Sequence, residues 1–130
     1  MSKIFVTRKI SESGIELLKK EGFDVEVSDF DGVLPHELLI EKIKGADAIL
    51  SLLTDKIDGE VMDASGGQLK IIANYAVGYD NLNLEDAKKR NIILTNTPEV
   101  LSETVAEHTF ALLLAIAHRI VESDQYFRDG

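Results

Sequence analysis

Residues 71–80 read Ile-Ile-Ala-Asn-Tyr-Ala-Val-Gly-Tyr-Asp, and this stretch decides the fold. A short apolar run, Leu69–Ala73, passes here into a loop of small residues, Ala76–Gly78. A second apolar run, Ile92–Thr95, then leads into a long apolar helical pattern. Short strands that alternate with helices are typical of βαβ units, so the stretch predicts a parallel sheet.

The same alternation runs through the rest of the chain. Helical patterns separate five apolar runs, which we expect to be the strands Lys3–Thr7, Val25–Val27, Ala46–Leu53, Leu69–Ala73 and Ile92–Thr95. Several of these runs are apolar on both faces, as expected for strands with helices on both sides. We therefore predict an α/β, flavodoxin-like three-layer sandwich with a five-stranded parallel sheet. Fold-level precedent gives the strand order 2-1-3-4-5.

The last helix differs from the others. It begins at Ser102 or at Thr104, where Thr104-Val-Ala-Glu107 fits a capping box, and its pattern continues to Arg128, roughly 37 Å further along. Phe110–Ala117 is apolar nearly all round, and such a helix needs neighbours on more than one side.

We accordingly expect a flavodoxin-like domain in residues 1–101 and a long helix of the interdomain type in residues 102–130. One face of this helix should pack on a second domain or a second chain. A homodimer in which residues 104–121 pair or swap between protomers is expected, because a swapped helix makes the same contacts as an unswapped one.

Composition excludes several classes of protein. The 130 residues are 45% hydrophobic and 28% charged, which is typical of one globular domain. The net charge of −9 argues against a nucleic-acid partner, and the absence of cysteine excludes disulfides and thiolate metal sites. The longest apolar run, Phe110–Ala117, is too short to span a bilayer. With an N-terminus that enters a strand at once, the chain is expected to be cytoplasmic and to have no membrane partner.

The small-residue loop is the candidate binding site. Ala76, Val77 and Gly78 follow a strand at the carboxyl edge of the sheet, where open α/β sheets place ligands. Consecutive backbone N–H groups there can hold an anion such as a carboxylate. The alternative is that Gly78 only permits a turn with positive φ. Leu53, after the third strand, and Asn96-Thr97-Pro98, after the fifth, would line the same crevice.

The sequence lacks the residues that several other kinds of functional site require. Neither Gly-x-Gly-x-x-Gly nor Gly-x-x-x-x-Gly-Lys-Ser/Thr occurs, so no nucleotide-phosphate loop is visible. A phospho-acceptor receiver domain would need acidic residues and a lysine at positions where this chain has Thr7, Ser51-Leu52 and Asn96. A flavin site would need a Ser/Thr/Gly-rich first loop. The three histidines, His36, His108 and His118, form no metal-binding pair of helical spacing.

Three linked segments resemble a known family. They are similar to the N-terminal part of the D-2-hydroxyacid dehydrogenases, and among these the glyoxylate/hydroxypyruvate reductases look most similar. The segments are Ile71–Asn81, Ile93–Pro98, and Val105-Ala-Glu107 with Ala111–Leu114. The resemblance covers the chain from Ile4 to Arg128. It implies a flavodoxin-like substrate domain that faces a Rossmann domain carrying NAD(P) across a cleft.

The resemblance also assigns roles to residues. Val77 and Gly78 would offer backbone N–H groups to the carboxylate of a 2-oxo acid. Ala76, in the same loop, would belong to the substrate-binding site, and Leu53 would line the substrate pocket. Val105 would approach the cofactor, although some glyoxylate reductases have Thr at this position.

The family's catalytic arginine, glutamate and histidine lie downstream of the matched region, as do its dinucleotide glycines and the segment that completes its substrate domain. We therefore expect this chain to bind no cofactor alone, to bind a 2-oxo acid weakly and to be inactive as a dehydrogenase by itself. It would be the substrate-binding half of such an enzyme, as a natural short protein, a fragment or an engineered half. The alternative is a stand-alone flavodoxin-like oligomerisation module.

Overall fold

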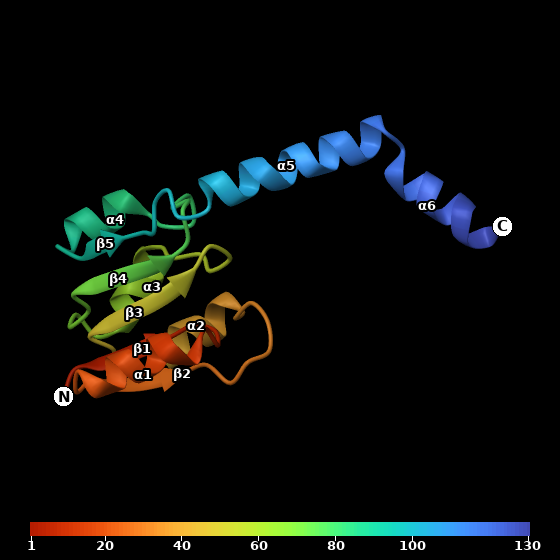
Figure 1. The fold of residues 1–130 in the computed structure, drawn as a ribbon. Helices are drawn as coiled ribbons and strands as arrows, with labels where there is room; N and C mark the ends of the chain where they lie inside the picture. Colours follow the sequence, from red (N-terminus) through yellow and green to blue (C-terminus); the bar gives the residue numbers. More distant parts are fainter. The chain divides into compact units, whose positions relative to one another are not determined.

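The computed structural model describes residues 1–130. It divides into two compact units, Met1–Pro98 and Glu99–Gly130 (Figure 1). The first unit holds all strands, and the second consists of two helices.

The first unit is built on a five-stranded sheet. Its strands are β1 (Lys3–Val6), β2 (Asp24–Val27), β3 (Ala48–Leu52), β4 (Ile71–Tyr75) and β5 (Ile93–Thr95). All neighbouring strands are parallel and follow the order β2-β1-β3-β4-β5, which confirms the predicted architecture and strand order (Figure 1). The register aligns Ile49 with Ile72 and Ile72 with Leu94 across the central strands.

Four helices connect these strands: α1 (Glu12–Lys20), α2 (His36–Lys42), α3 (Gly59–Ala64) and α4 (Leu84–Lys89). The last two begin at side-chain caps, because Asp58 accepts a hydrogen bond from Val61 N–H and Asn83 accepts one from Asp86 N–H. Such caps satisfy backbone donors that have no partner within the helix.

The core lies in two clusters, one on each face of the sheet. The larger cluster joins Phe5, Ile49 and Ile72 of the strands to residues of α2, α3 and α4 and to Ile43, which follows α2; the helix residues are Leu39, Val61, Met62 and Ala87. The smaller cluster joins Ile4 and Val6 to Ile15 of α1. Helices therefore lie on both faces of the sheet, as expected.

Coverage of the α1 face is incomplete. In β4, Ile72 and Asn74 are buried, whereas Ile71 and Ala73 on the opposite face are only partly buried. In β5, Ile93 is 60% exposed. An apolar cavity of about 300 Å³ opens on this face and is lined by residues that include Leu50, Ile71 and Ala73. Within the first unit, β3, β4 and β5 thus present an apolar surface that α1 does not cover.

The second unit differs from the expected single helix. It contains α5 (Ser102–Ala117) and α6 (Ile120–Asp129), which meet at 55°. The break lies at Arg119, whose φ of 51° is left-handed and ends the helical path. Neither cap expected at the start is formed, because Leu101 is the N-cap and makes no side-chain cap bond.

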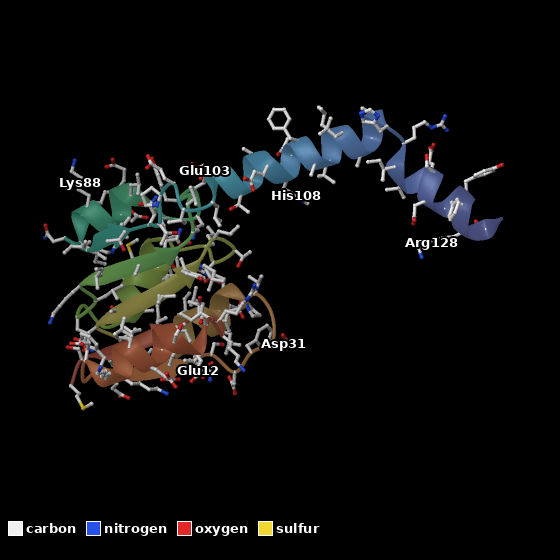
Figure 2. The ribbon with its side chains drawn as sticks, viewed as in Figure 1. Glu12, Asp31, Lys88, Glu103, His108 and Arg128 are labelled. Atoms are coloured by element: carbon white, nitrogen blue, oxygen red, sulfur yellow. The ribbon has the colours of Figure 1, made fainter.

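No residue of α5 or α6 is buried within the structure. The side chains project from these helices on several sides, as Figure 2 shows for the stretch that contains His108. No single helix is both long and apolar enough to cross a membrane; α5 and α6 reach that length and composition only when the bent pair is counted together.

Candidate functional site

The loops at the carboxyl edge of the sheet bring most of the predicted site residues together. Leu53 follows β3, the loop Ala76–Gly78 follows β4, and Asn96 follows β5. Because the strands are parallel neighbours, their loops leave from the same edge (Figure 1). Leu53 is 64% exposed and Val77 is 38% exposed, so both side chains can reach a ligand.

All three carbonyl groups of the loop after β4 are bound to the protein. Ala76 O accepts a hydrogen bond from Thr97 N–H at 2.9 Å. Val77 O accepts one from Asn96 Nδ2 at 2.8 Å, and Gly78 O accepts one from Asn74 Nδ2 at 3.0 Å. The carbonyl oxygens of the loop therefore point toward other residues of the protein and are not available to a ligand.

The donors of the same loop are free. Neither Val77 N–H nor Gly78 N–H donates a hydrogen bond within the chain, whereas Ala76 N–H donates to Asn74 O at 2.8 Å. In a trans peptide the C=O and N–H groups point in opposite directions, and the chain contains no cis peptide. The bonds to Ala76 O and Val77 O therefore leave the N–H groups of Val77 and Gly78 facing away from the groups that hold the carbonyls.

Ala76 makes a different contribution from its two neighbours. Its side chain is buried, and both its N–H and its carbonyl are used inside the protein. It offers no free donor to a ligand and instead fixes the start of the loop.

Gly78 is not required by the shape of the turn. Its φ lies outside the left-handed region, unlike that of Gly45, whose φ is 75°. This contradicts the alternative in which Gly78 serves a positive φ. A Cβ atom added at Gly78 would meet nothing within 4 Å, so the space beside its N–H is open. Because glycine has no side chain and no other group of the chain fills this space, a ligand can approach the Gly78 N–H closely.

A pair of hydrogen-bonded side-chain amides, Asn74 and Asn81, holds the loops in place. Asn74, which is 2% exposed, and Asn81 exchange two hydrogen bonds, of 3.1 and 3.2 Å. Asn74 Oδ1 also accepts from Ser51 Oγ, and Asn81 Nδ2 also donates to Leu52 O and Asp55 O. The pair thus binds the loop after β3 to the loop after β4.

A buried carboxylate shapes the loop that carries Leu53. Asp55 is 4% exposed and accepts hydrogen bonds from Thr7 Oγ1 at 2.5 Å and from Leu52 N–H at 2.8 Å. The bond to Leu52 N–H closes a tight turn around Leu53, and the bond to Thr7 connects this turn to the end of β1. Leu53 is therefore exposed on a turn whose two ends are fixed.

The amides Asn74 and Asn81 do not appear among the residues that the sequence singles out for the site. One signal could have pointed to Asn74. Ser51 and Asn74 are polar residues at the ends of otherwise apolar strands, and buried polar side chains there need partners. Their partners, however, lie 4 to 29 residues away in the sequence, so only the folded chain identifies them.

A charged cluster lies at the N-terminus of α3. Asp58 contacts His36 Nε2 and Lys56 Nζ, each at 3.2 Å, while it caps the helix. Burial alone would raise the pKa of Asp58, but the bond from Val61 N–H together with Lys56 and His36 outweighs it and holds the pKa below the usual 3.8. Helix capping accounts for this cluster.

The residues of this chain do not fit a nicotinamide dinucleotide by themselves. The loop after β1, residues 7–11, contains no glycine, and the hydroxyl of Thr7 is buried against Asp55. A phosphate-binding turn needs glycines that let the backbone approach the phosphates. Val105, the residue expected near a cofactor, is 58% exposed on α5 in the second unit. No cluster of three or more metal-binding side chains is formed, and His108 and His118 are exposed.

Comparison with known proteins gives a consistent result. Residues 4–123 match the profile of the D-isomer specific 2-hydroxyacid dehydrogenase catalytic domain. The glyoxylate reductase of Pyrococcus furiosus is 48% identical over 128 residues, which are 98% of this chain and 38% of that protein. This chain thus spans about two fifths of the length of that relative.

Solved structures show the same fold. The TT0316 protein from Thermus thermophilus superimposes with a TM-score of 0.90 at 42% identity, over 98% of this chain and 40% of that one. The NAD⁺-bound 3-phosphoglycerate dehydrogenase of Entamoeba histolytica gives a TM-score of 0.74 at 31% identity, over 88% of this chain and 38% of that one. With its flavodoxin-like sheet and its glyoxylate reductase-like sequence, the chain belongs to the D-isomer specific 2-hydroxyacid dehydrogenase family and corresponds to its catalytic, substrate-binding domain.

Proposed function

We propose that the chain binds the carboxylate of a small 2-oxo acid on the N–H groups of Val77 and Gly78, as the substrate-binding domain of an NAD(P)-dependent 2-hydroxyacid dehydrogenase. One observation carries this proposal: every carbonyl of the loop is bound to the protein, while these two N–H groups have no partner. Backbone donors without acceptors attract anions, and a carboxylate offers two acceptor oxygens.

The chemistry of the surroundings favours a small organic acid. The chain has a net charge of −9, so the loop must attract an anion through its own peptide dipoles rather than through the charge of the whole molecule. The exposed side chains of Leu53 and Val77 supply apolar contacts beside the donors. Two hydrogen bonds to a charged group contribute about 3–6 kcal/mol, and the cost of association offsets much of this, so we expect weak binding, in the millimolar range or weaker.

We expect no dehydrogenase activity from this chain alone. The family's arginine, glutamate, histidine and dinucleotide glycines lie beyond the matched region, and the loop after β1 lacks the glycines of a phosphate site. Incubation of the chain with NADH and glyoxylate should leave the nicotinamide absorbance unchanged. Turnover above the buffer rate would contradict this expectation.

Binding is tested by nuclear magnetic resonance on the nitrogen-15-labelled chain. Addition of pyruvate should shift the amide resonances of Val77 and Gly78 and leave those at the opposite edge, such as Gly45, unchanged. Saturable shifts confined to this loop would support the proposal, whereas unchanged Val77 and Gly78 resonances would refute it.

Self-association is a second candidate function, and a specific observation favours it. Apolar side chains of α5 are exposed around the helix, with Phe110, Leu113 and Ile116 each more than half exposed. Independently, the first unit presents the uncovered apolar surface of β3, β4 and β5. Exposed apolar surfaces of this kind mark interaction sites. A homodimer through α5, or a cofactor domain packed on α5, would cover the helix.

The solution mass decides between these forms of the isolated chain. Light scattering over a hundredfold range of protein concentration should give the mass of a dimer throughout if α5 pairs between copies. The mass of a single chain at every concentration would contradict self-association.

A further inference from the structure

We propose that Asn96, which follows β5, is a positioning residue for the candidate site: its side-chain amide orients the peptide unit between Val77 and Gly78, so that the Gly78 N–H faces the bound carboxylate. This inference rests on the proposed function. It gives a role in that function to a residue on the neighbouring strand, whereas the sequence suggests only that Asn96 lines the crevice.

The geometry acts through one peptide plane. Asn96 Nδ2 donates to Val77 O at 2.8 Å. Val77 C=O and Gly78 N–H belong to the same trans peptide, in which the two groups point in opposite directions. The bond from Asn96 therefore keeps the Gly78 N–H turned outward. Rotation of this plane would bring Val77 O outward instead, and a carbonyl oxygen repels a carboxylate.

No other group of the chain holds this plane. Val77 O accepts only from Asn96, and Gly78 N–H donates to no atom of the protein. Thr97 N–H binds Ala76 O and so orients the preceding plane, while Asn74 binds Gly78 O and so orients the following plane. Each of the three successive peptide planes is thus oriented by one hydrogen bond to its carbonyl, and Asn96 donates the bond to the central plane.

Asn96 can be removed without disturbing the core. It is only partly buried, and its single side-chain bond joins it to an exposed loop. Its replacement leaves no buried polar group without a partner, unlike replacement of Asn74. A loss of binding in an Asn96 variant can therefore be separated from a loss of folding.

The test combines nitrogen-15 relaxation of the free chain with a pyruvate titration. In Asn96→Ala the order parameter of the Gly78 N–H should fall from about 0.85, typical of rigid backbone, to below about 0.6. The dissociation constant for pyruvate should rise at least about tenfold, in line with the loss of one hydrogen bond to a charged group. Asn96→Asp keeps the shape but replaces the donor with a charged acceptor, so it should weaken binding further.

Gln68→Ala is the matched control. Gln68 Nε2 also donates to a loop carbonyl, that of Gly45, but it does so before β3 and β4, at the opposite edge of the sheet. This variant should keep the wild-type order parameter at Gly78 and the wild-type affinity. If Gln68→Ala weakened pyruvate binding as much as Asn96→Ala does, the effect would be general and the positioning role would be overturned.

The outcomes separate the two proposals. If the wild type binds pyruvate at Val77 and Gly78 while Asn96→Ala keeps both the wild-type order parameter and the wild-type affinity, the positioning role is wrong and the proposed function stands. If the wild type itself shows no pyruvate-dependent shifts at these amides, the proposed function fails and the positioning role fails with it.

Discussion

Replacement of Gly78 by alanine separates a role in folding from a role in binding. The backbone of Gly78 lies outside the left-handed region, and a Cβ there would meet nothing within 4 Å. Alanine therefore fits the folded chain without strain. Because alanine also restricts the unfolded chain, Gly78→Ala should stabilise the fold by about 0.4–1 kcal/mol, measured by urea unfolding.

Binding should change in the opposite direction. The added methyl group stands beside the N–H that a carboxylate must approach to about 2.9 Å. We expect pyruvate to bind at least about tenfold more weakly, which corresponds to about 1.4 kcal/mol. A nitrogen-15 titration of the variant measures this loss at Val77, whose own N–H is unchanged.

Gly45→Ala provides the matched control. Gly45 also has open space where a methyl group would stand, since nothing lies within 4 Å of a Cβ there, but its φ of 75° is left-handed. Alanine at this position should cost about 1–2 kcal/mol of stability and leave pyruvate binding unchanged. If Gly78→Ala destabilised the chain like Gly45→Ala, or bound pyruvate like the wild type, the reasoning about Gly78 would be refuted.

Three further changes test other parts of the structure. Asn81→Ala leaves Leu52 O and Asp55 O without the amide that binds them, so urea unfolding should show a loss of about 1–3 kcal/mol; an unchanged midpoint would contradict the role of the amide pair. Asp58→Asn keeps the helix cap but does not titrate. Because the folded pKa of Asp58 lies below 3.8, the wild type gains stability from this group above that pH and loses it as the pH falls through the folded pKa. The stability advantage of wild type over Asp58→Asn should therefore shrink in acid, and a constant difference from about pH 6 to about pH 2 would disprove the assignment. Leu113→Glu places a charge on α5, so the solution mass should fall to that of one chain; a persistent dimer would place the contact elsewhere.

The strand pattern could be predicted because its causes are local. Runs such as Ile49-Leu50 and Ile71-Ile72, separated by helical patterns, indicate a parallel sheet, whereas the strand order comes from the precedent of similar folds and not from the residues. The break at Arg119 could not be predicted in this way. Neither glycine nor proline marks it, and a left-handed arginine follows no local preference.

The candidate site could be predicted only in outline. A small-residue loop after β4 points to Val77 and Gly78, because backbone donors are exposed where side chains are small. The side chains that orient this loop, those of Asn74 and Asn96, could not be identified in the same way. Nothing in the sequence pairs an amide after β5 with a carbonyl after β4, or shows that the amide of Asn74 turns back to the loop that follows it. These roles become visible only in the tertiary contacts.

The most direct test of carboxylate binding compares pyruvate with its neutral amide, pyruvamide, on the nitrogen-15-labelled chain. The two compounds share their shape and their keto group, and they differ in the charge that the free N–H groups of Val77 and Gly78 are proposed to bind. We predict saturable shifts of these two amide resonances with pyruvate. The dissociation constant for pyruvamide, measured from the same resonances, should be at least about tenfold higher. Equal responses to both compounds, or no response at this loop, would contradict the proposal that its backbone donors hold a carboxylate.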